Sequence, residues 1–295
     1  MYHLLYGLFY LVSLLPFAVL YLISDIVAFI LRYVIHYRKS VIRKNLQIAF
    51  PEKSEAERES IRKRFYRNLT DNFIESIKLL SISQKSLEQR FHAENPEVMY
   101  KFYQQNKNIT VVLGHFFNWE YTNQLYSLKV KQDLVVVYMP IKNQIFNRMF
   151  VKLRSRYQTH LVSAHRYASE IKPFGKERPY CVILVADQNP GNTHRSFWTP
   201  FFGHMTPFVK GPEKGAALGK HAVLFCSIKK TKRGHYTSRV EVLTENARET
   251  PNGFITTQMV AHIEQDLREQ PDNYLWSHNR FRHEYAEEVF GKQVV

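Results

Sequence analysis

The sequence predicts a single α/β domain, in which a mostly parallel or mixed central sheet is flanked by helices and preceded by an apolar amino-terminal helix or helical hairpin. Short apolar runs rich in β-branched residues alternate with segments long enough for helices. The 295 residues are 45% hydrophobic, which is enough to fill one large core. Internal repeats, low-complexity tracts and Gly/Ser linkers are absent from the sequence, so we expect no second globular domain.

The first predicted element is the segment Leu4–Ser24, which contains no Asp, Glu, Lys or Arg. As a helix it would reach across about 30 Å of hydrocarbon. No Lys or Arg precedes Arg32 and no small-residue cleavage site follows, so a removable signal peptide is disfavoured. We expect residues 1–35 to form a membrane anchor and residues 36–295 the remaining domain. Because Pro16 interrupts the apolar run, a buried helical hairpin and a true membrane span both stay open.

The chain carries a strong excess of positive charge. Lys and Arg number 41 against 26 Asp and Glu, a formal net charge of +15, which favours an anionic partner. Several of these charges follow the apolar segment directly: Arg32, Arg38, Lys39, Arg43 and Lys44. The positive-inside rule therefore predicts that the rest of the chain lies on the cytoplasmic side of the membrane.

The next predicted elements are one long helix and five strands. Apolar residues recur at helical spacing at Ile61, Phe65, Leu69, Phe73, Ile77 and Leu80, with Arg62, Lys63, Arg64 and Arg67 on the other side. Five apolar runs then read as strands: Ile109–Leu113, Leu134–Tyr138, Tyr180–Ala186, Ala222–Ile228 and Ser238–Leu243. We expect helices between them to cover both faces of a sheet.

A histidine and a carboxylate follow the first of these strands, as His115 and Glu120. Five residues apart on one helix, they would point about 140° from one another and could not touch. Asn118 is a good N-cap candidate, so we expect His115 on the loop and Glu120 in the first helical turn, close enough to hold the imidazole. Such a pair can act as a general base, although both residues also suit purely structural roles.

Two polar clusters lie near the ends of later strands. Basic residues, including Lys152, Arg154 and Arg156, follow the strand that ends at Tyr138, where they could clamp a phosphate or simply form a solvated helix face. Asp187 and Gln188 directly follow another buried strand, a favoured position for a site in an α/β sheet, although an acid there can also cap a turn.

Two further clusters contain glycine and aromatic residues. Phe201-Phe202-Gly203 leads into the small-residue segment 211–219, which suits close helix packing or the lining of a slim apolar chain. The segment 271–282 interleaves aromatic residues with Arg280 and Arg282, which could stack nucleic-acid bases or pin the chain terminus to the domain.

Both cysteines, Cys181 and Cys226, fall inside strand-like runs and have no partner at metal-ligand spacing. We expect them to be reduced core residues. The HExxH pattern is missing from the sequence, so we expect neither a metal nor another cofactor. G-x-S-x-G is missing too, which disfavours a serine nucleophile.

Taken together, these motifs resemble the lipid A biosynthesis acyltransferase family, the late lauroyl/myristoyl-type enzymes of the wider lysophospholipid acyltransferase superfamily. The resemblance covers nearly the whole chain. It rests on the order and spacing of the apolar amino-terminal segment, residues 43–51, the block from Gly114 to Glu120, residues 186–188, Phe201-Phe202-Gly203 and residues 274–281. The tail departs from the family's W-x-H-R-R-F pattern, because Asn279 stands at one Arg position.

The resemblance implies transfer of a fatty acyl group from an acyl carrier protein or coenzyme A thioester to a hydroxyl of an anionic lipid acceptor, most naturally a lipid A precursor in lipopolysaccharide synthesis. It implies a catalytic dyad at His115 and Glu120. Arg154, Lys152, Asp187, Gln188, Asn118 and Arg156 are the candidates for substrate binding. The expected location is the cytoplasmic face of the bacterial inner membrane.

Other functions stay open at this stage. A lysophospholipid or an aminolipid could replace lipid A as acceptor. A membrane-attached nucleic-acid-binding protein would use Arg62–Arg67, Lys229–Arg233 and the aromatic tail, but no RNP, KH, helix-turn-helix or zinc signature supports it, so we expect no nucleic-acid partner. An inactive scaffold is disfavoured because both dyad positions are filled.

Overall fold

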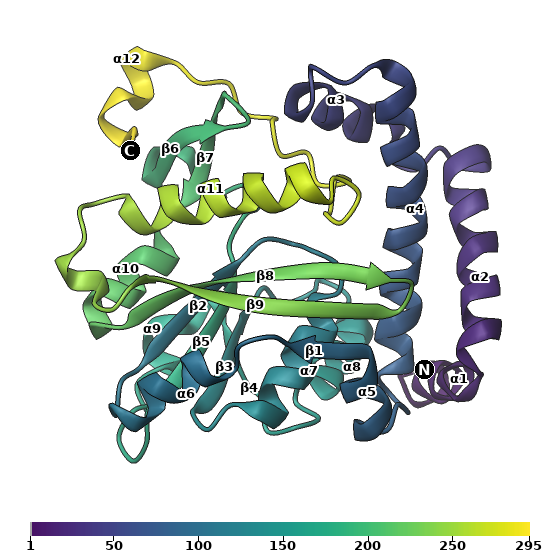
Figure 1. Cartoon of the computed structure of the whole chain (residues 1–295), viewed down its shortest axis with the longest axis horizontal. Helices are drawn as coiled ribbons and strands as arrows, with labels where there is room; N and C mark the ends of the chain where they lie inside the picture. Colours follow the sequence, from purple (N-terminus) through teal and green to yellow (C-terminus); the bar gives the residue numbers. More distant parts are fainter. Residues whose placement is uncertain (1) are drawn as a thin grey trace.

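The computed structural model describes residues 2–295; residue 1 of the predicted anchor lies outside the described residues. Its centre is one seven-stranded sheet of strand order β1-β9-β8-β2-β5-β3-β4 (Figure 1). Within this sheet β8 and β9 pair antiparallel and the other pairings are parallel. The strands are β1 Phe91–Ala93, β2 Ile109–Leu113, β3 Asp133–Tyr138, β4 His160–Ser163, β5 Tyr180–Val185, β8 Ala222–Lys232 and β9 His235–Thr244. The predicted α/β class with a mostly parallel sheet is confirmed.

All five predicted strands are present, and four strands were not predicted. β1 and β4 have only three and four residues, too few for a clear alternation of apolar and polar side chains. β6 (Ser196–Phe201) and β7 (His204–Val209) form a separate antiparallel hairpin. Its turn is Phe202-Gly203, with φ values of 51° and 71°, so this part of the predicted glycine cluster serves as a two-residue hairpin turn.

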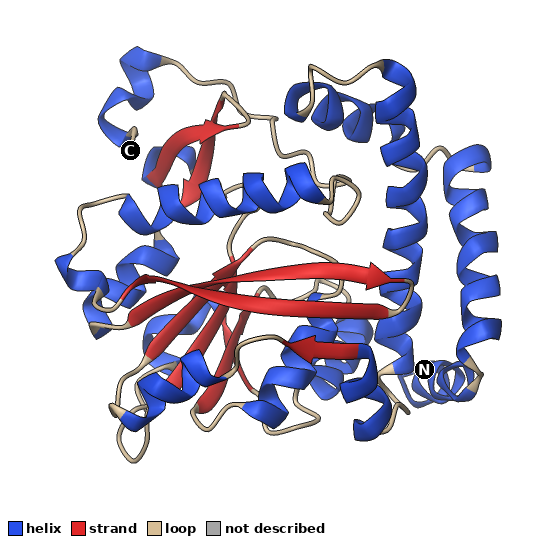
Figure 2. Cartoon of the chain, in the orientation of Figure 1, coloured by secondary structure: helices blue, strands red, loops and turns tan. Residues whose placement is uncertain are grey.

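Helices surround the sheet, as Figure 2 shows. The amino-terminal group is α1 Tyr2–Leu14, α2 Phe17–Phe29, the π-helix η1 Ile30–Val34, α3 Lys39–Ala49 and α4 Glu55–Lys78. The helices between or after the strands are α5 Gln84–Arg90, α6 Glu97–Gln104, α7 Trp119–Lys129, α8 Gln144–Arg154, α9 Tyr167–Glu170, α10 Gly211–Gly219, α11 Phe254–Glu269 and α12 Glu287–Phe290. Single 3₁₀ turns occur at Ala164–Arg166, Thr193–Arg195, Ala247–Glu249 and Gly291–Gln293.

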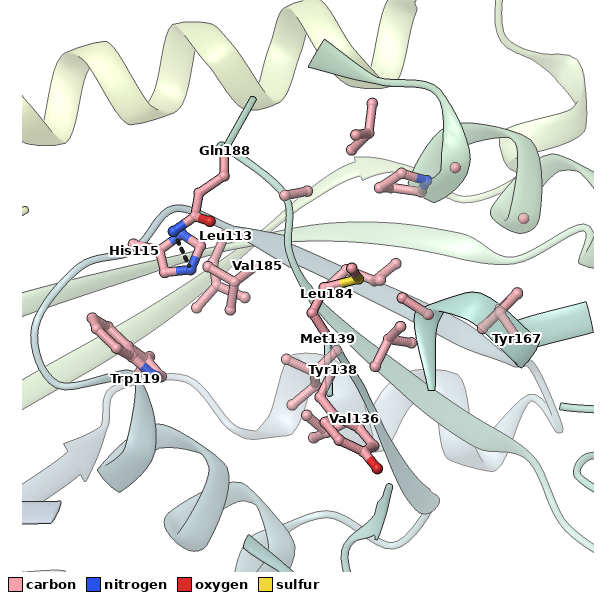
Figure 3. Close-up of a pocket in the computed structure, with 18 of the residues that line it drawn as sticks. Leu113, His115, Trp119, Val136, Tyr138, Met139, Tyr167, Leu184, Val185 and Gln188 are labelled. Atoms are coloured by element: carbon pink, nitrogen blue, oxygen red, sulfur yellow. Dashed lines mark hydrogen bonds between the residues drawn. The ribbon is translucent and has the colours of Figure 1, made fainter. Parts of the chain in front are cut away.

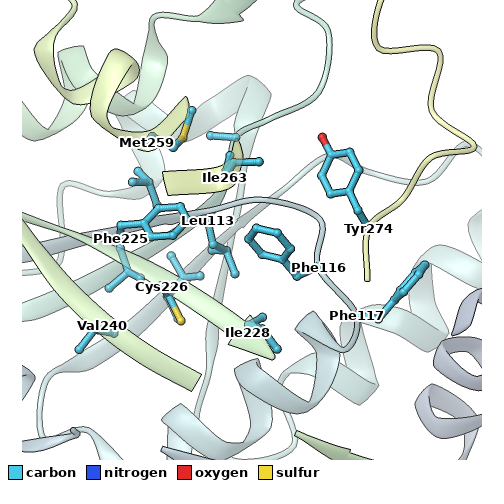
Figure 4. Close-up of a cluster of buried hydrophobic side chains, with 14 of the residues drawn as sticks. Leu113, Phe116, Phe117, Phe225, Cys226, Ile228, Val240, Met259, Ile263 and Tyr274 are labelled. Atoms are coloured by element: carbon cyan, nitrogen blue, oxygen red, sulfur yellow. The ribbon is translucent and has the colours of Figure 1, made fainter. Parts of the chain in front are cut away.

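The main core lies between the sheet and α11, which crosses one face of it (Figures 1 and 4). Leu113, Phe225 and Ile263 are buried there together with Phe116 from the loop after β2. Cys181 and Cys226 are buried and unpaired, as predicted. Burial raises the pKa of the Cys226 thiol to about 12, so this thiol is protonated and unsuited to nucleophilic attack.

Helix α4 follows the predicted apolar face only in its first half. Ile61, Phe65 and Leu69 are buried as expected, but Phe73 is 54% exposed, so the predicted face is wrong at that position. Asp71 and Glu75 are buried instead. The physical reason is that α2 and the β8–β9 hairpin cover this side of α4 and supply polar partners for both carboxylates.

The predicted anchor is a pair of helices, α1 and α2, that meet at Pro16, and α1 lies across the end of α2 in place of forming a hairpin with it (Figure 1). The apolar stretch Phe17–Val34 is long enough to cross a membrane. In the structure, however, α2 packs alongside α4 (Figure 1), and its Ser24 hydroxyl donates a 2.7 Å hydrogen bond to Asp71. The apolar helix α2 is therefore attached to the charged domain along its length.

Candidate active site

The candidate site lies at the carboxyl ends of β2, β5 and β3, where ligands bind in open α/β sheets. β2 ends at Leu113, and the loop that follows carries His115 before α7 begins. β5 ends at Val185, and Asp187 follows two residues later. Because β2 and β5 are parallel neighbours, their loops emerge side by side and bring these two residues together.

His115 is bound to Asp187 through two contacts. Its Nδ1 lies 2.5 Å from Asp187 Oδ1, and its backbone N–H donates to Asp187 Oδ2 over 3.1 Å. Burial alone would raise the pKa of Asp187, but the contacts with His115 outweigh it and hold that pKa well below its usual range. An ionised carboxylate only accepts hydrogen bonds, so Nδ1 donates to it, and in the neutral ring this leaves a free lone pair on Nε2.

The predicted contact between His115 and Glu120 is not among the hydrogen bonds of residues 2–295. Glu120 does occupy the first turn of α7, and the side chain of Asn118 caps that helix by accepting from the Tyr121 N–H, as predicted. The carboxylate points elsewhere, however, and Asp187 takes the position beside Nδ1. The prediction failed because Asp187 is distant in the sequence and reaches His115 only through strand pairing.

Glu120 pairs instead with Arg154, the last residue of α8. The guanidinium donates from Nη2 to Oε1 over 2.5 Å and from Nε to Oε2 over 3.0 Å. Burial opposes the charge on Arg154, but Glu120 outweighs that effect and raises the pKa of the guanidinium. Such a two-point contact fixes both side chains in one orientation.

Trp119 lies between the two charged pairs. Its ring meets the His115 ring edge to face, with centroids 5.4 Å apart, and its indole N–H donates to Glu120 Oε1 over 3.1 Å. One aromatic side chain therefore contacts both the imidazole and the second carboxylate. Sequence reasoning overlooked Trp119, although its place between Asn118 and Glu120 was visible.

A cavity of about 760 Å³ opens beside these residues, a volume typical of small-molecule sites. His115 and Gln188 lie at one end and Tyr167 at the other (Figure 3). Glu120 and Arg154 contribute charge to its wall, and most of the remaining lining is apolar or small: Leu113, Val136, Val137, Met139, Ile141, Ile183, Leu184, Val185, Ala186, Gly211 and Gly215. The arrangement suits a ligand with a long apolar part and a polar reacting end.

Gln188 lies against the unprotonated side of His115. Its Nε2 is 3.2 Å from His115 Nε2, so the amide can donate to the ring lone pair (Figure 3). This is the position that a hydroxyl would take when His115 removes its proton. Asp187 and Gln188, adjacent in the sequence, thus contact the two opposite nitrogens of one ring.

The carboxy-terminal segment supports the site from behind. Leu275 N–H donates to the His115 carbonyl over 3.2 Å, and Tyr274 helps to hold the pKa of Asp187 low. Arg280 is buried and donates to Asn189 Oδ1 over 2.6 Å, while His278 Nε2 accepts from the Asn189 N–H. These residues make the aromatic and basic tail a structural support, the second of the two alternatives that the sequence allowed.

Helix α3 in turn holds this tail. The side-chain amide of Asn45 donates to the carbonyls of Trp276 and His278 over 2.8 and 2.7 Å. Two of the motifs that carried the family resemblance are thereby in contact, although 231 residues separate Asn45 from Trp276.

Four of the six predicted substrate-binding residues do not line the cavity: Lys152, Arg156, Asn118 and Asp187. Lys152 places its ammonium over the Tyr6 ring of α1, 4.1 Å from the centroid. Arg156 donates to the carbonyls of Leu79 and Ile82. Asn118 is buried as the cap of α7. Of the predicted substrate-binding residues, Arg154 and Gln188 line the cavity, and Asp187 lies directly behind His115.

Within residues 2–295 we find no group of three or more His, Cys, Asp or Glu side chains arranged to hold a metal ion. The chemistry that the site offers is that of its own side chains: an oriented imidazole, an amide at its far nitrogen, and an Arg–Glu pair on the cavity wall.

Comparison with known proteins agrees with the family resemblance of the sequence motifs. The model of the bacterial lipid A biosynthesis acyltransferase family matches residues 1–283. The chain is 24% identical over 279 residues, 94% of its length, to the lipid A biosynthesis palmitoleoyltransferase of Escherichia coli (strain K12), of which 89% is covered. The lipid A biosynthesis acyltransferase of Shigella flexneri matches with the same identity and coverage.

Proposed function

The chain belongs to the bacterial lipid A biosynthesis acyltransferase family, and from this premise we propose that it moves a fatty acyl group from a thioester to a hydroxyl of a lipid A precursor, with His115 as general base. The oriented His115–Asp187 pair at one end of a largely apolar cavity is the observation that carries the proposal. As an enzyme of this family it is an acyltransferase acting in lipid A synthesis.

In the proposed reaction, the acceptor hydroxyl displaces the Gln188 amide from His115 Nε2. The Nε2 lone pair takes the hydroxyl proton as the oxygen attacks the thioester carbonyl, and Asp187 stabilises the imidazolium that forms. The tetrahedral intermediate collapses with loss of the thiolate, which takes up the proton from His115. No acyl-enzyme is needed, in agreement with the buried and protonated Cys226.

The oxyanion of the intermediate needs hydrogen-bond donors. The Gln188 amide, once released from Nε2, is the first candidate to donate to the former carbonyl oxygen, which carries that charge. Arg154 is the second candidate, because its contacts with Glu120 use Nε and Nη2, and no hydrogen bond of residues 2–295 engages Nη1. In this proposal Glu120 supports catalysis by holding Arg154, rather than by contacting the imidazole.

The apolar part of the cavity would hold the acyl chain, with the thioester carbonyl beside His115. The donor is an acyl carrier protein or a coenzyme A thioester, and a net charge of +15 suits either anionic donor. The acceptor is an anionic lipid. The alternative acceptors are a lysophospholipid, which offers a hydroxyl, and an aminolipid, which offers an amine. Offering each lipid separately distinguishes them from a lipid A precursor.

We further propose that residues 1–35 attach the protein to the bilayer surface and that residues 36–295 form the acyltransferase domain. Leu4, Leu8 and Leu11 of α1 are exposed. Phe9 of α1 packs on Phe146 of α8, with centroids 6.4 Å apart, so the apolar surface of α1 adjoins the helix that carries Arg154. Attachment of α2 along α4 favours a helix lying on the membrane over one crossing it. We place this surface on the cytoplasmic face, where the basic residues after α2 would meet anionic headgroups.

The test is acyl transfer by the purified full-length protein, with acyl carrier protein and coenzyme A thioesters offered separately. Mass spectrometry of a lipid A precursor, a lysophospholipid and an aminolipid reads both the acceptor and the chain gained. His115→Ala should reduce the rate about 10²- to 10⁴-fold while leaving the fold intact. Undiminished transfer by a folded His115→Ala protein would remove His115 from the mechanism, and transfer to none of the acceptors would refute the function.

A further inference from the structure

Glu75, in the last turn of α4, is a fully buried carboxylate that joins three distant parts of the chain. It accepts hydrogen bonds from the Tyr21 hydroxyl of α2 over 2.8 Å, from the Asn118 amide over 2.9 Å and from the Tyr236 hydroxyl of β9 over 2.8 Å. A buried carboxylate is costly unless its oxygens are satisfied, so these donors explain how the chain tolerates it. They do not explain why a carboxylate lies there.

Its contact with Asn118 suggests an answer. An asparagine amide has one donating end and one accepting end. Glu75 accepts from the Nδ2 end, which leaves Oδ1 facing the Tyr121 N–H over 3.1 Å as the cap of α7. A reversed amide would place donors against the Tyr121 N–H. Glu75 therefore determines which way Asn118 caps the helix, and so where the first turn of α7 lies.

That first turn belongs to the site. Asn118 ends the loop that starts at His115, and the two residues after it are Trp119, which contacts the His115 ring, and Glu120, which binds Arg154. A small displacement of the turn would move both contacts. Catalytic rate is sensitive to such displacements even where binding is not.

On its other side, Glu75 contacts Tyr21 of the apolar helix α2. Tyr21 is held against α4 by neighbours on its own helix, because Ser24 donates to Asp71 and Asp25 pairs with Arg233. The turn between β8 and β9 also leaves room for it, since a Cβ at Gly234 would lie 1.9 Å from the Tyr21 hydroxyl oxygen. The Tyr21 hydroxyl thus reaches Glu75 only when α2 is docked on α4 and this hairpin.

We infer that Glu75 is a positioning residue that links docking of the apolar helix α2, through Asn118, to the arrangement of the catalytic turn of α7. The inference rests on the proposed function for its kinetic readout. The helix α2 would then support the site as well as attach the protein to the membrane. The full rate therefore requires docked α2 even when the acceptor is dispersed in detergent.

The first experiment reverses the polarity of the Glu75–Asn118 contact in the full-length protein. Asn118→Asp places two buried carboxylates together and should lower kcat at least tenfold, with KM for the thioester little changed. Adding Glu75→Gln to this variant supplies an amide donor to the new carboxylate, and aspartate caps helices as well as asparagine does. We expect Glu75→Gln with Asn118→Asp to regain most of the lost kcat. A double variant as impaired as Asn118→Asp would overturn the inference.

The second experiment tests the link to α2. Tyr21→Phe removes the hydroxyl that reaches Glu75, and Tyr10→Phe removes an exposed hydroxyl from α1 as a matched control. With a detergent-dispersed acceptor, Tyr21→Phe should lower kcat about tenfold, the effect of losing one buried hydrogen bond, and Tyr10→Phe should not. Amide exchange at Tyr121 should accelerate in Tyr21→Phe alone, a readout that needs no activity. Equal kcat and equal exchange in both variants would refute the coupling.

Wild-type protein and His115→Ala accompany both experiments. Failure of the proposed function then shows as an inactive wild type. Failure of the present inference shows as an active wild type whose Tyr21→Phe and Asn118→Asp variants keep its kcat, or as unchanged exchange at Tyr121.

Discussion

His115 and Asp187, 72 residues apart in the chain, lie with Nδ1 and Oδ1 separated by 2.5 Å, while Glu120, in the first turn of the helix after the His115 loop, binds Arg154. Two carboxylates near one imidazole therefore have different partners. Asp187 contacts the ring and fixes its tautomer, and Glu120 holds a guanidinium on the cavity wall. The two acids should consequently give different phenotypes when they are replaced.

Asp187→Asn should lower kcat about 10²- to 10⁴-fold, because an amide beside Nδ1 can favour the wrong tautomer and cannot stabilise the imidazolium. KM for the thioester should change much less, since Asp187 lies behind the ring and does not line the cavity. Steady-state kinetics with circular dichroism as the control for folding measures both effects. A variant with wild-type kcat would place the orienting role elsewhere.

Glu120→Gln should destabilise the protein by about 2 kcal/mol, because it leaves the largely buried Arg154 guanidinium without a counter-charge. Arg154→Met added to the same chain removes the unpaired charge and should restore part of that loss. Urea unfolding of the wild type, both single variants and the double variant gives the four unfolding free energies of a double-mutant cycle. Activity should stay low in all three variants if Arg154 binds an anionic group.

A double variant no more stable than Glu120→Gln would contradict this prediction. That outcome would mean that the unpaired Arg154 charge is not what destabilises the Glu120→Gln variant.

A negative charge introduced beside the cavity should weaken membrane binding. Met139 is 61% exposed and lines the cavity, and Phe146 is 40% exposed beside α1. Glutamate at either position removes apolar surface and adds a charge that anionic lipid repels, so we expect affinity for anionic vesicles to fall about tenfold. Val242→Glu, at an exposed valine of β9 that does not line the cavity, is the control. Equal flotation of all variants with vesicles would exclude the cavity rim from the membrane contact.

Sequence patterns predicted what is periodic or local. The five strand runs and the Asn118 cap follow from side-chain order alone, and all are present in the structure. The partner of His115 could not be found in that way, because Asp187 reaches it through the pairing of β2 with β5. The polar face of α4 was hidden for a related reason: Asp71 and Glu75 are buried only because α2 and the β8–β9 hairpin supply their donors. Contacts between distant segments, rather than local preference, decide both cases.

His221 should make stability depend on pH. The ring is buried, with Thr110 Oγ1 2.8 Å from Nδ1 and the Tyr180 hydroxyl 3.0 Å from Nε2. Burial lowers the pKa of His221 from 6.5 to about 4. Between these values the unfolded chain binds the proton more tightly than the folded protein does. The contribution of neutral His221 is therefore complete above pH 6.5 and is lost as the pH falls towards 4, by about 3 kcal/mol at most.

The difference in unfolding free energy between wild type and His221→Gln isolates this effect, because other groups contribute slopes of their own in the same range. His278 also has a pKa lowered to about 4 by burial, whereas burial raises the pKa of Asp266 to about 6 and gives a slope of opposite sign. Urea unfolding of both proteins from about pH 7 to pH 4.5 should show the wild type losing stability faster than the glutamine variant as the pH falls. Parallel curves would show that His221 keeps an ordinary pKa in the folded protein, and that Thr110 and Tyr180 accommodate the charged ring.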